Sequence, residues 1–255
     1  MSVLLQESRE AATEIIRVEG IGKSFGPLRV LENISFQVRP GEIIALLGAS
    51  GCGKSTLLNI LSGLLPPDEG QILIQGQPAS QFNRWQTVGY LFQEDRLLPW
   101  RTVGKNINFG LENGDYDRKE RQKRVKDVLR LVNLQDFEHA WPHQLSGGMR
   151  SRVALARSLV AEPEILLMDE PFSKLDPQTR SVMHNELLRI QRLTAMTVVM
   201  VTHDVEEAVV LADRVVILRP NPGHIHHIHP ISLPHPRVPT SPEVAEQARL
   251  LRLEV

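Results

Sequence analysis

The sequence predicts an α/β fold with a mostly parallel core sheet, an N-terminal antiparallel β lobe and an inserted helical subdomain. Apolar segments of strand length recur along the chain and alternate with helical patterns in its second half. A glycine-rich loop joins one of these strands to a helix, and a charged helical stretch interrupts the alternation between Leu97 and Leu145. Alternation of this kind is typical of a parallel sheet covered by helices.

The β lobe is predicted from two early strands, at residues 15–18 and 34–38, the second of which ends at a Pro40-Gly41 turn. A helix with a solvated charged face is predicted at residues 118–131, because seven basic side chains accompany apolar residues at helical spacing. Buried strands are predicted at residues 43–47, 71–74, 88–92, 165–168, 197–201 and 214–218.

Composition restricts the classes of function. The 255 residues are 42% hydrophobic and carry 29 basic against 30 acidic side chains, so we expect a globular protein that does not bind nucleic acid. The single cysteine, Cys52, and the absence of a leader at Met1-Ser2-Val3 indicate a reducing cytoplasmic compartment. No apolar run approaches the ~18 residues of a membrane span. A role at a membrane would therefore require docking to another chain.

The most informative motif follows the apolar strand at residues 43–47 and reads Gly48-Ala49-Ser50-Gly51-Cys52-Gly53-Lys54-Ser55. Strand, loop and helix stand in the order of a P-loop NTPase, in which backbone N–H groups converge on phosphate oxygens. We expect Lys54 to reach the outer phosphates and the Ser55 hydroxyl to bind Mg²⁺. Cys52 is expected to fill space in the loop, so that alkylation of its thiol blocks ATP binding.

A second motif places two carboxylates at the end of a buried strand. Asp169 and Glu170 follow the apolar residues 165–168 and precede Pro171. Asp169 is suited to hold a metal ion, and Glu170 to act as the general base that orients and polarises a water molecule. The alternative is an exposed acidic strand end with no function.

A third motif, Leu145-Ser146-Gly147-Gly148-Met149, begins a predicted helix. Ser146 is a natural N-cap, and the two glycines leave the first-turn amides uncovered, so this helix start could bind an anion. Taken alone, the same three residues Ser146-Gly147-Gly148 are more typical of a simple cap.

Together these motifs resemble an ATP-binding cassette (ABC) ATPase, in that family's order and over residues 20–218. The resemblance implies a single nucleotide-binding domain over residues 1–255, with a β lobe and ATPase core (15–92 and 160–218), a helical subdomain (93–159) and a Pro/His-rich tail (219–255). It also implies hydrolysis of ATP with Mg²⁺, and a dimer in which residues 145–149 complete the nucleotide site of a second cassette. The ATP-binding residues that it implies are Phe25, Gly48, Ala49, Ser50, Gly51, Cys52, Gly53, Lys54, Ser55, Thr56 and Gln93, with Ser55, Gln93 and Asp169 as metal ligands.

Three residues outside the motifs match family positions. Gln93 follows a strand and matches the glutamine whose amide reaches Mg²⁺. His203 follows another strand and matches the histidine that donates a hydrogen bond to the γ-phosphate, which makes it a catalytic residue beside Glu170. Phe25 matches the aromatic position that stacks on adenine, and without the resemblance it would be interpreted as a core residue.

Two positions depart from the family pattern. Lys174, in Ser173-Lys174-Leu175-Asp176, replaces a small residue, and its ammonium group is expected to meet a carboxylate of the partner or water. Ser151 stands two positions after the signature, where the family often has glutamine, and this change is expected to affect helix contacts rather than hydrolysis. Asp176 and Pro177 are also predicted to begin a helix as N-cap and first residue.

Residues 93–103 match the region in which transporter cassettes receive the coupling helix of a membrane subunit. Trp100 is suited to anchor such an interface, although it could equally pack within its own subdomain. The motif Leu97-Leu98-Pro99-Trp100 and the tail resemble bacterial importers of nitrate, sulfonates and taurine, with their bicarbonate-type relatives.

The tail carries five of the nine histidines of the chain. On a strand, His224 and His226 would lie on one face and His227 and His229 on the other, which divides the cluster and favours a solvated surface over a metal site. A short amphipathic helix is predicted to begin near Ser241-Pro242-Glu243.

The predicted function is ATP hydrolysis that powers a bacterial ABC importer of a small anion such as nitrate, sulfonate, taurine or bicarbonate, at the cytoplasmic face of the inner membrane. The implied partners are a second ATPase subunit, identical or not, transmembrane permease subunits and, indirectly, an extracytoplasmic substrate-binding protein. A non-transport cassette that acts as an ATP-dependent interaction switch is the alternative, whereas a P-loop kinase leaves Ser146-Gly147-Gly148 unexplained. Substrate contacts belong to the permease and the binding protein, so the sequence does not identify the substrate.

Overall fold

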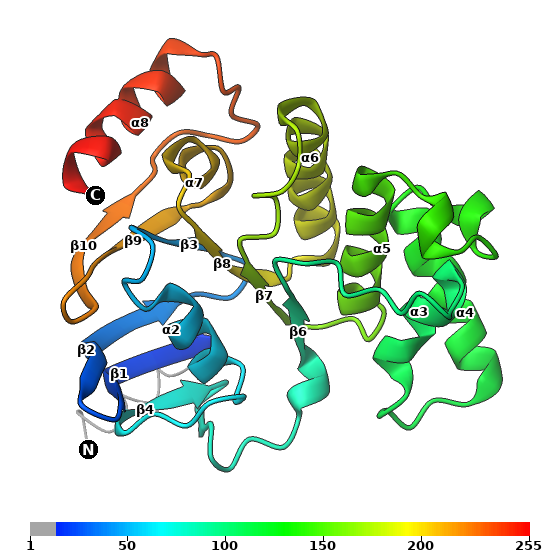
Figure 1. The fold of residues 1–255 in the computed structure, drawn as a ribbon, viewed down its shortest axis with the longest axis horizontal. Coiled ribbons are helices and arrows are strands. Elements are labelled where there is room, and N and C mark those ends of the chain that lie inside the picture. Colours follow the sequence, from blue (N-terminus) through cyan, green and yellow to red (C-terminus); the bar gives the residue numbers. More distant parts are fainter. Residues whose placement is uncertain (1–13) are drawn as a thin grey trace, which may run out of the picture. The chain divides into compact units, whose positions relative to one another are not determined.

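A computed structural model describes residues 14–255. The predicted lack of a leader at residues 1–3 lies outside this range. The chain divides into two compact units, one of which ends at Asn83 and resumes with Thr197–Val255, while the other is Arg84–Met196 (Figure 1).

The first unit contains the antiparallel lobe. β1 (Ile16–Phe25) pairs with β2 (Leu28–Val38) and with β4 (Glu69–Ile74), and β5 (Gln77–Pro78) completes the order β2-β1-β4-β5. The β1–β2 hairpin is longer than predicted, because pairing continues through polar residues as far as Phe25 and Leu28. Backbone hydrogen bonds hold this extension, which an apolar pattern does not reveal.

The same unit holds four strands in the order β10-β9-β3-β8. Their bounds are Ile43–Gly48 for β3, Thr197–Thr202 for β8, Arg214–Arg219 for β9 and His224–Pro230 for β10. β3 pairs in parallel with β8 and β9, whereas β10 is antiparallel to β9. Every residue of β3 and β8 is buried, as expected for parallel strands that are covered on both faces. Among the described residues of this unit, the helices are α2 (Lys54–Leu61), α7 (Val205–Leu211) and α8 (Pro242–Glu254).

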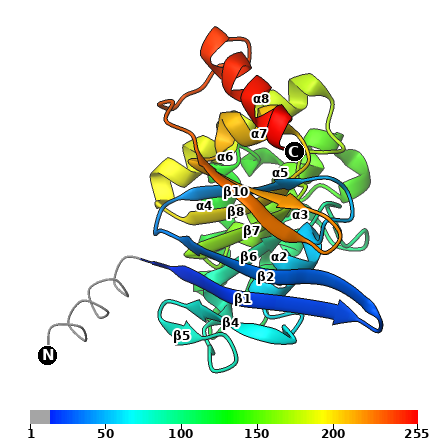
Figure 2. The same cartoon turned by 90° about the vertical axis from the view of Figure 1, so that its left-hand side faces the viewer.

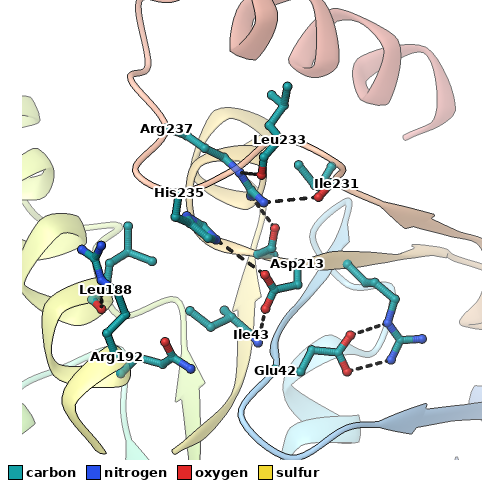
Figure 3. A network of polar contacts seen from close by, with 12 residues as sticks. Glu42, Ile43, Leu188, Arg192, Asp213, Ile231, Leu233, His235 and Arg237 are labelled. Atoms are coloured by element: carbon teal, nitrogen blue, oxygen red, sulfur yellow. Dashed lines mark hydrogen bonds and ion pairs between the residues drawn. The ribbon is translucent and has the colours of Figure 1, made fainter. Parts of the chain in front are cut away.

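The Pro/His-rich tail is anchored to this unit by a buried arginine. Arg237 is 6% exposed and donates to the backbone carbonyls of Val209 at 2.7 Å and Ala212 at 2.6 Å. It also donates to the carbonyls of Leu233 at 2.9 Å and Ile231 at 3.3 Å (Figure 3). One guanidinium group therefore joins the tail to the end of α7.

Asp213 lies in the same network. Its carboxylate accepts a hydrogen bond from the backbone N–H of Ile43 at 2.8 Å and lies 3.6 Å from His235 Nε2 (Figure 3). Burial raises the pKa of Asp213, but His235 and the Ile43 amide outweigh that effect, so its pKa lies below the ordinary value. The carboxylate thus stays ionised beside the buried guanidinium.

The second unit contains the parallel pair β6 (Val88–Leu91) and β7 (Ile165–Asp169). Its helices are α3 (Val103–Asn108), α4 (Arg118–Leu131), α5 (Gly147–Leu159) and α6 (Pro177–Thr194). The predicted cap of α6 is confirmed, since the Asp176 carboxylate accepts from Thr179 N at 3.0 Å. The predicted α/β class is confirmed by the antiparallel lobe and the parallel strand pairs of the two units. Within residues 14–255, no helix combines the length and the apolar character needed to cross a membrane.

Candidate nucleotide-binding site

The phosphate loop joins β3 to α2 in the first unit. Gly53 has φ 94°, and a Cβ there would lie 2.5 Å from Leu31 Cδ2. A Cβ on Gly48 would lie 2.3 Å from the carbonyl oxygen of Leu218. Glycine is therefore required at Gly53 by conformation and space, and at Gly48 by space alone.

Lys54 lies inside the loop that precedes it. Its ammonium group donates to the carbonyl oxygens of Gly48 at 2.7 Å and Ala49 at 3.0 Å, and the residue is only 5% exposed. Ser55, the next residue, is exposed, so its hydroxyl is accessible from solvent. Cys52 is fully buried, so a thiol reagent can reach it only when the loop opens.

His203 is placed at the same strand edge as the phosphate loop. In the parallel pairing of β3 with β8, Leu47 lies opposite Thr202, so Gly48, the last residue of β3, and His203, the residue after β8, both lie at the carboxyl ends. The turn after His203 is fixed because the Asp204 carboxylate accepts from the N–H groups of Glu206 and Glu207. His203 itself is exposed.

Phe25 ends β1 with half of its surface, 49%, exposed. This exposure excludes the interpretation of Phe25 as a core residue. The ammonium group of Lys23 lies 5.6 Å from the ring centroid and also pairs with Asp68 at 2.7 Å. The exposed ring thus offers a flat face suited to stacking.

Gln93 and the two carboxylates lie at one strand edge of the second unit. β6 and β7 run parallel with Leu91 opposite Met168, so Asp169, the last residue of β7, and Gln93, two residues after β6, lie at neighbouring strand ends. The Gln93 amide donates to the Ser173 hydroxyl at 3.4 Å. Glu170 has φ 44°, and its carbonyl accepts from both the backbone N–H and the hydroxyl of Ser173. An uncommon backbone conformation is therefore held in place at the predicted general base.

The predicted cap of the third motif is confirmed. The Ser146 hydroxyl accepts from Met149 N at 3.3 Å at the start of α5. Gly147 has open space at its Cβ position, with only the tip of Arg150 within 4 Å. A Cβ on Gly148 would lie 2.8 Å from a methyl group of Thr179. The first turn of α5 therefore keeps an accessible face at Gly147.

Two arginines of α5 hold the loop that follows Gln93. Arg157 donates to the carbonyls of Arg96 at 2.7 Å and Asp95 at 2.6 Å, and Arg150 contacts the Asp95 carboxylate at 3.2 Å. Burial lowers the pKa of Arg157. Sequence reasoning missed both residues, because their partners are backbone groups or come from a distant segment. These contacts make α5 and the Gln93 loop one connected part.

Lys174 forms an ion pair within its own chain. Its ammonium group lies 2.8 Å from the Glu94 carboxylate, and the hydrogen bond lowers the pKa of Glu94. The sequence had suggested a carboxylate of the partner or water. Both side chains are largely exposed, at 59% and 65%, so we expect the pair to contribute little to stability.

Trp100 projects from a loop that one buried side chain holds in place. Trp100 is 70% exposed, which excludes the interpretation that it packs within its subdomain. Asn106 is fully buried, accepts from Leu98 N at 2.7 Å and donates to the carbonyls of Leu98 and Arg101. Sequence reasoning did not identify Asn106. The exposed indole is thus presented on a rigid loop.

A cavity of about 600 Å³ lies within the second unit. Arg96 lies over the Phe92 ring at 4.0 Å, and both residues line the cavity together with Arg157. Other aromatic residues of its wall are Trp85, Tyr90, Phe109 and Tyr116. The cavity therefore offers apolar faces with cationic groups and is bounded by the same loop that begins at Gln93.

Comparisons with known proteins agree on one family. The family described as ABC transporter matches residues 31–173. An aliphatic sulfonates import ATP-binding protein, SsuB 1 of Xanthomonas axonopodis pv. citri, is 46% identical over 89% of this chain and 90% of its own length. A taurine import ATP-binding protein, TauB of Burkholderia pseudomallei, is 48% identical over 78% of this chain and 76% of its own length.

Two solved structures share the fold. CbiO1 from Clostridium perfringens, part of an ABC transporter complex, has a TM-score of 0.81 and 28% identity, with 95% of this chain and 98% of that chain covered. A dimeric ATP-binding cassette bound to ADP and Pi has a TM-score of 0.73 and 29% identity, covering 86% and 99%. The family match extends over more than half of the sequence, so the chain belongs to the ABC transporter family, as an ATP-binding ATPase subunit coupled to transport.

Proposed function

We propose that this chain powers the import of a small anion, of the sulfonate or taurine type or a relative such as nitrate or bicarbonate, from the cytoplasmic face of a bacterial inner membrane. Coupling of the ATP site to the permease is supported by the contacts of the segment that follows β6. Gln93 lies at its start, Phe92 and Arg96 line the aromatic cavity, and Arg157 fixes its backbone to α5. A movement at Gln93 is therefore passed to the cavity wall through a few direct contacts.

The cavity and Trp100 are the proposed docking surface for the permease. Trp100 offers a large rigid apolar area at low entropic cost, and the Asn106 hydrogen bonds keep its loop ordered. The cavity has room for large side chains of a partner helix, and its aromatic lining suits an apolar residue. An extracytoplasmic substrate-binding protein would act indirectly, through the permease.

The residues proposed to bind and hydrolyse ATP lie mainly at the ends of strands or in the loops that follow them. The loop 48–55 and Thr56 bind the phosphates of ATP, Phe25 stacks on its base, and Glu170 accepts the proton of the attacking water. His203 donates a hydrogen bond to the γ-phosphate, which holds the reacting group in line. In this proposal residues 1–255 act as one nucleotide-binding domain.

The donor atoms offered for a metal ion fit Mg²⁺. Ser55, Gln93 and Asp169 supply a hydroxyl, an amide carbonyl and a carboxylate, which are the hard oxygen ligands that this ion prefers. When bound, Mg²⁺ would neutralise charge on the β- and γ-phosphates. Lys54 and the loop amides bind the same phosphates from the protein side.

The signature residues Leu145, Ser146, Gly147, Gly148 and Met149 are proposed to act on the ATP of a second cassette. Support comes from the accessible first turn of α5 at Gly147 and from the dimeric cassette that shares this fold. The positive end of the α5 dipole would then face a γ-phosphate. The second cassette is a further copy of this chain or a paralogue.

Transport assays in the native host test this function. A deletion strain complemented with the wild-type gene should regain uptake of radiolabelled taurine or an alkanesulfonate, and a K54A variant should not. A tagged wild-type chain should also co-purify with an integral membrane permease from detergent-solubilised membranes. The alternative, an ATP-dependent switch, would be supported by two results together. The tagged chain would co-purify with soluble proteins only, and the deletion strain would take up taurine and alkanesulfonates as well as the undeleted host.

A further inference from the structure

We propose that His227, His229 and Glu254 form a zinc-binding site that ties the C-terminal helix to the edge strand β10. One ligand atom from each side chain lies within 4.8 Å of the other two. His227 and His229 are two positions apart on β10, which places them on one face of the strand. Glu254 is the last residue of α8, and the end of α8 lies beside β10 in both views (Figure 1, Figure 2).

The Glu254 carboxylate lacks a partner for one of its oxygens, and a bound cation would supply it. Its Oε2 atom is buried and has no hydrogen-bond partner, and its Oε1 atom lies 3.9 Å from His229 Nδ1. The Glu254 side chain as a whole is 32% exposed, so water still reaches part of the carboxylate, but the buried Oε2 atom lacks the donor that a buried polar atom normally has. Arg219, the cation that contacts this helix end, donates at 3.0 Å to the backbone carbonyl of Glu254. Its guanidinium therefore leaves the carboxylate oxygen without a donor.

Gln247 orients His229 as a ligand. His229 Nε2 lies 3.3 Å from Gln247 Oε1, which is an acceptor, so Nε2 carries the proton. In the neutral imidazole, Nδ1 then holds a lone pair, and this atom is the one near Glu254. A ligand histidine commonly donates its other ring N–H to an oxygen in this way, which fixes its tautomer.

Two imidazoles and one carboxylate form a ligand set typical of Zn²⁺, with a fourth position open to water. Ligand atoms of a tetrahedral zinc site lie about 3.3 Å apart, given bonds of about 2.0–2.1 Å. The exposed His227 ring can rotate to close the present separation of up to 4.8 Å. The alternation of side chains along a strand divides the four histidines into two pairs. Glu254 of α8 adds a third ligand to the pair His227 and His229, which makes this pair a candidate site.

Zinc titration of the untagged, metal-stripped, nucleotide-free protein tests the site. Isothermal titration calorimetry with ZnCl₂ should give one equivalent per chain, and H227A, H229A and E254Q should each weaken binding at least about 10-fold. Q247A should weaken it by a similar factor, since it removes the partner that orients His229. The matched control is the double variant H224A/H226A from the same strand, which should bind zinc like the wild type.

Hydrogen exchange provides a second readout that does not depend on ATPase activity. Zinc should slow amide exchange in α8 of the wild type and of H224A/H226A, and should leave exchange in H229A unchanged. The proposal is overturned if the wild type binds no more zinc than the double variant H227A/H229A, or if E254Q keeps full affinity. Either result would leave a His229–Glu254 ion pair as the explanation of the contact.

Discussion

At the scale of single residues, Glu170 is the side chain on which hydrolysis is expected to depend most. Its positive φ and the two contacts of Ser173 to its carbonyl fix the backbone at the end of β7. E170Q keeps the shape but removes the base, so turnover should fall about 10²–10⁴-fold while ATP still binds. Steady-state phosphate release and equilibrium binding of labelled ATP measure the two effects separately.

A nearby carboxylate serves as the matched control. Glu94 is exposed and pairs with Lys174, so E94Q should keep wild-type turnover because an exposed ion pair contributes little. Equal loss of turnover in E94Q and E170Q would show that any carboxylate near Gln93 has this effect. The assignment of Glu170 as general base would then be wrong.

Asn106 supports a second prediction at this scale. Its amide satisfies one N–H and three carbonyl groups of residues 98–102, all from a fully buried position. N106A should therefore lower the free energy of unfolding by about 1–3 kcal/mol, because buried polar groups lose their partners. Urea denaturation measures this, and N108A, at the end of the same helix, should stay within about 0.5 kcal/mol of the wild type.

The same residues show what a sequence can and cannot reveal. Lys54 and Glu170 could be predicted because their chemistry depends on short local motifs next to a strand. Asn106 and Arg157 could not, because their partners are mainly backbone carbonyls that only the folded chain brings together. The direct partner of Lys174 was missed for a similar reason, since Glu94 lies 80 positions earlier in the chain.

At the scale of elements, buried strands were predicted well and the ends of the hairpin poorly. β3 and β8 are continuous apolar runs, which a parallel strand covered on both faces requires. The β1–β2 hairpin instead continues to its tip, where the paired residues Phe25 and Leu28 are exposed. Sequence periodicity detects burial, and it gives no signal where strand pairing continues beyond the buried residues.

Arg237 gives a prediction about how the tail is attached. R237A leaves the buried carbonyls of Val209 and Ala212 without this donor and removes a cation near the partly exposed Asp213. The free energy of unfolding should fall by about 1–3 kcal/mol for each buried carbonyl that loses its donor. Arg249 is exposed and pairs only with Glu246 among the described residues, so R249A should leave the free energy of unfolding close to the wild-type value. Similar losses in both variants, measured by thermal or urea unfolding, would exclude a specific anchoring role for Arg237.

At the scale of the whole molecule, the motifs predicted the fold class and the family, because their order along the chain is itself informative. Strand ends within each unit could be expected to gather the site residues, since parallel strands expose their carboxyl ends on one edge. The aromatic cavity could not be anticipated, because its wall comes from segments between Trp85 and Ala161 that share no sequence pattern.

A dimer with shared sites makes a final prediction, through mixing of inactive variants. K54A disables the phosphate loop of its own chain, and G147D places a negative charge at the start of α5, where the structure has space for it. If α5 acts on the partner's ATP, a mixed dimer has one site with a wild-type loop and a wild-type signature. With random pairing of equal amounts, ATPase activity should recover to about a quarter of the wild-type level.

The control mixture is K54A with E170Q. Because Lys54 and Glu170 serve the same ATP in the proposed mechanism, each site of the mixed dimer carries one of the two defects, and turnover should stay near zero. Phosphate release is measured after the purified chains have been mixed with ATP and allowed to exchange. Recovery in both mixtures would show that Lys54 and Glu170 of one chain serve different ATP molecules, which contradicts the proposed site. Recovery in neither would argue against sites that are shared between identical chains. If ATPase activity recovers only in the mixture of K54A with G147D, the signature and the phosphate loop of one site must come from different chains.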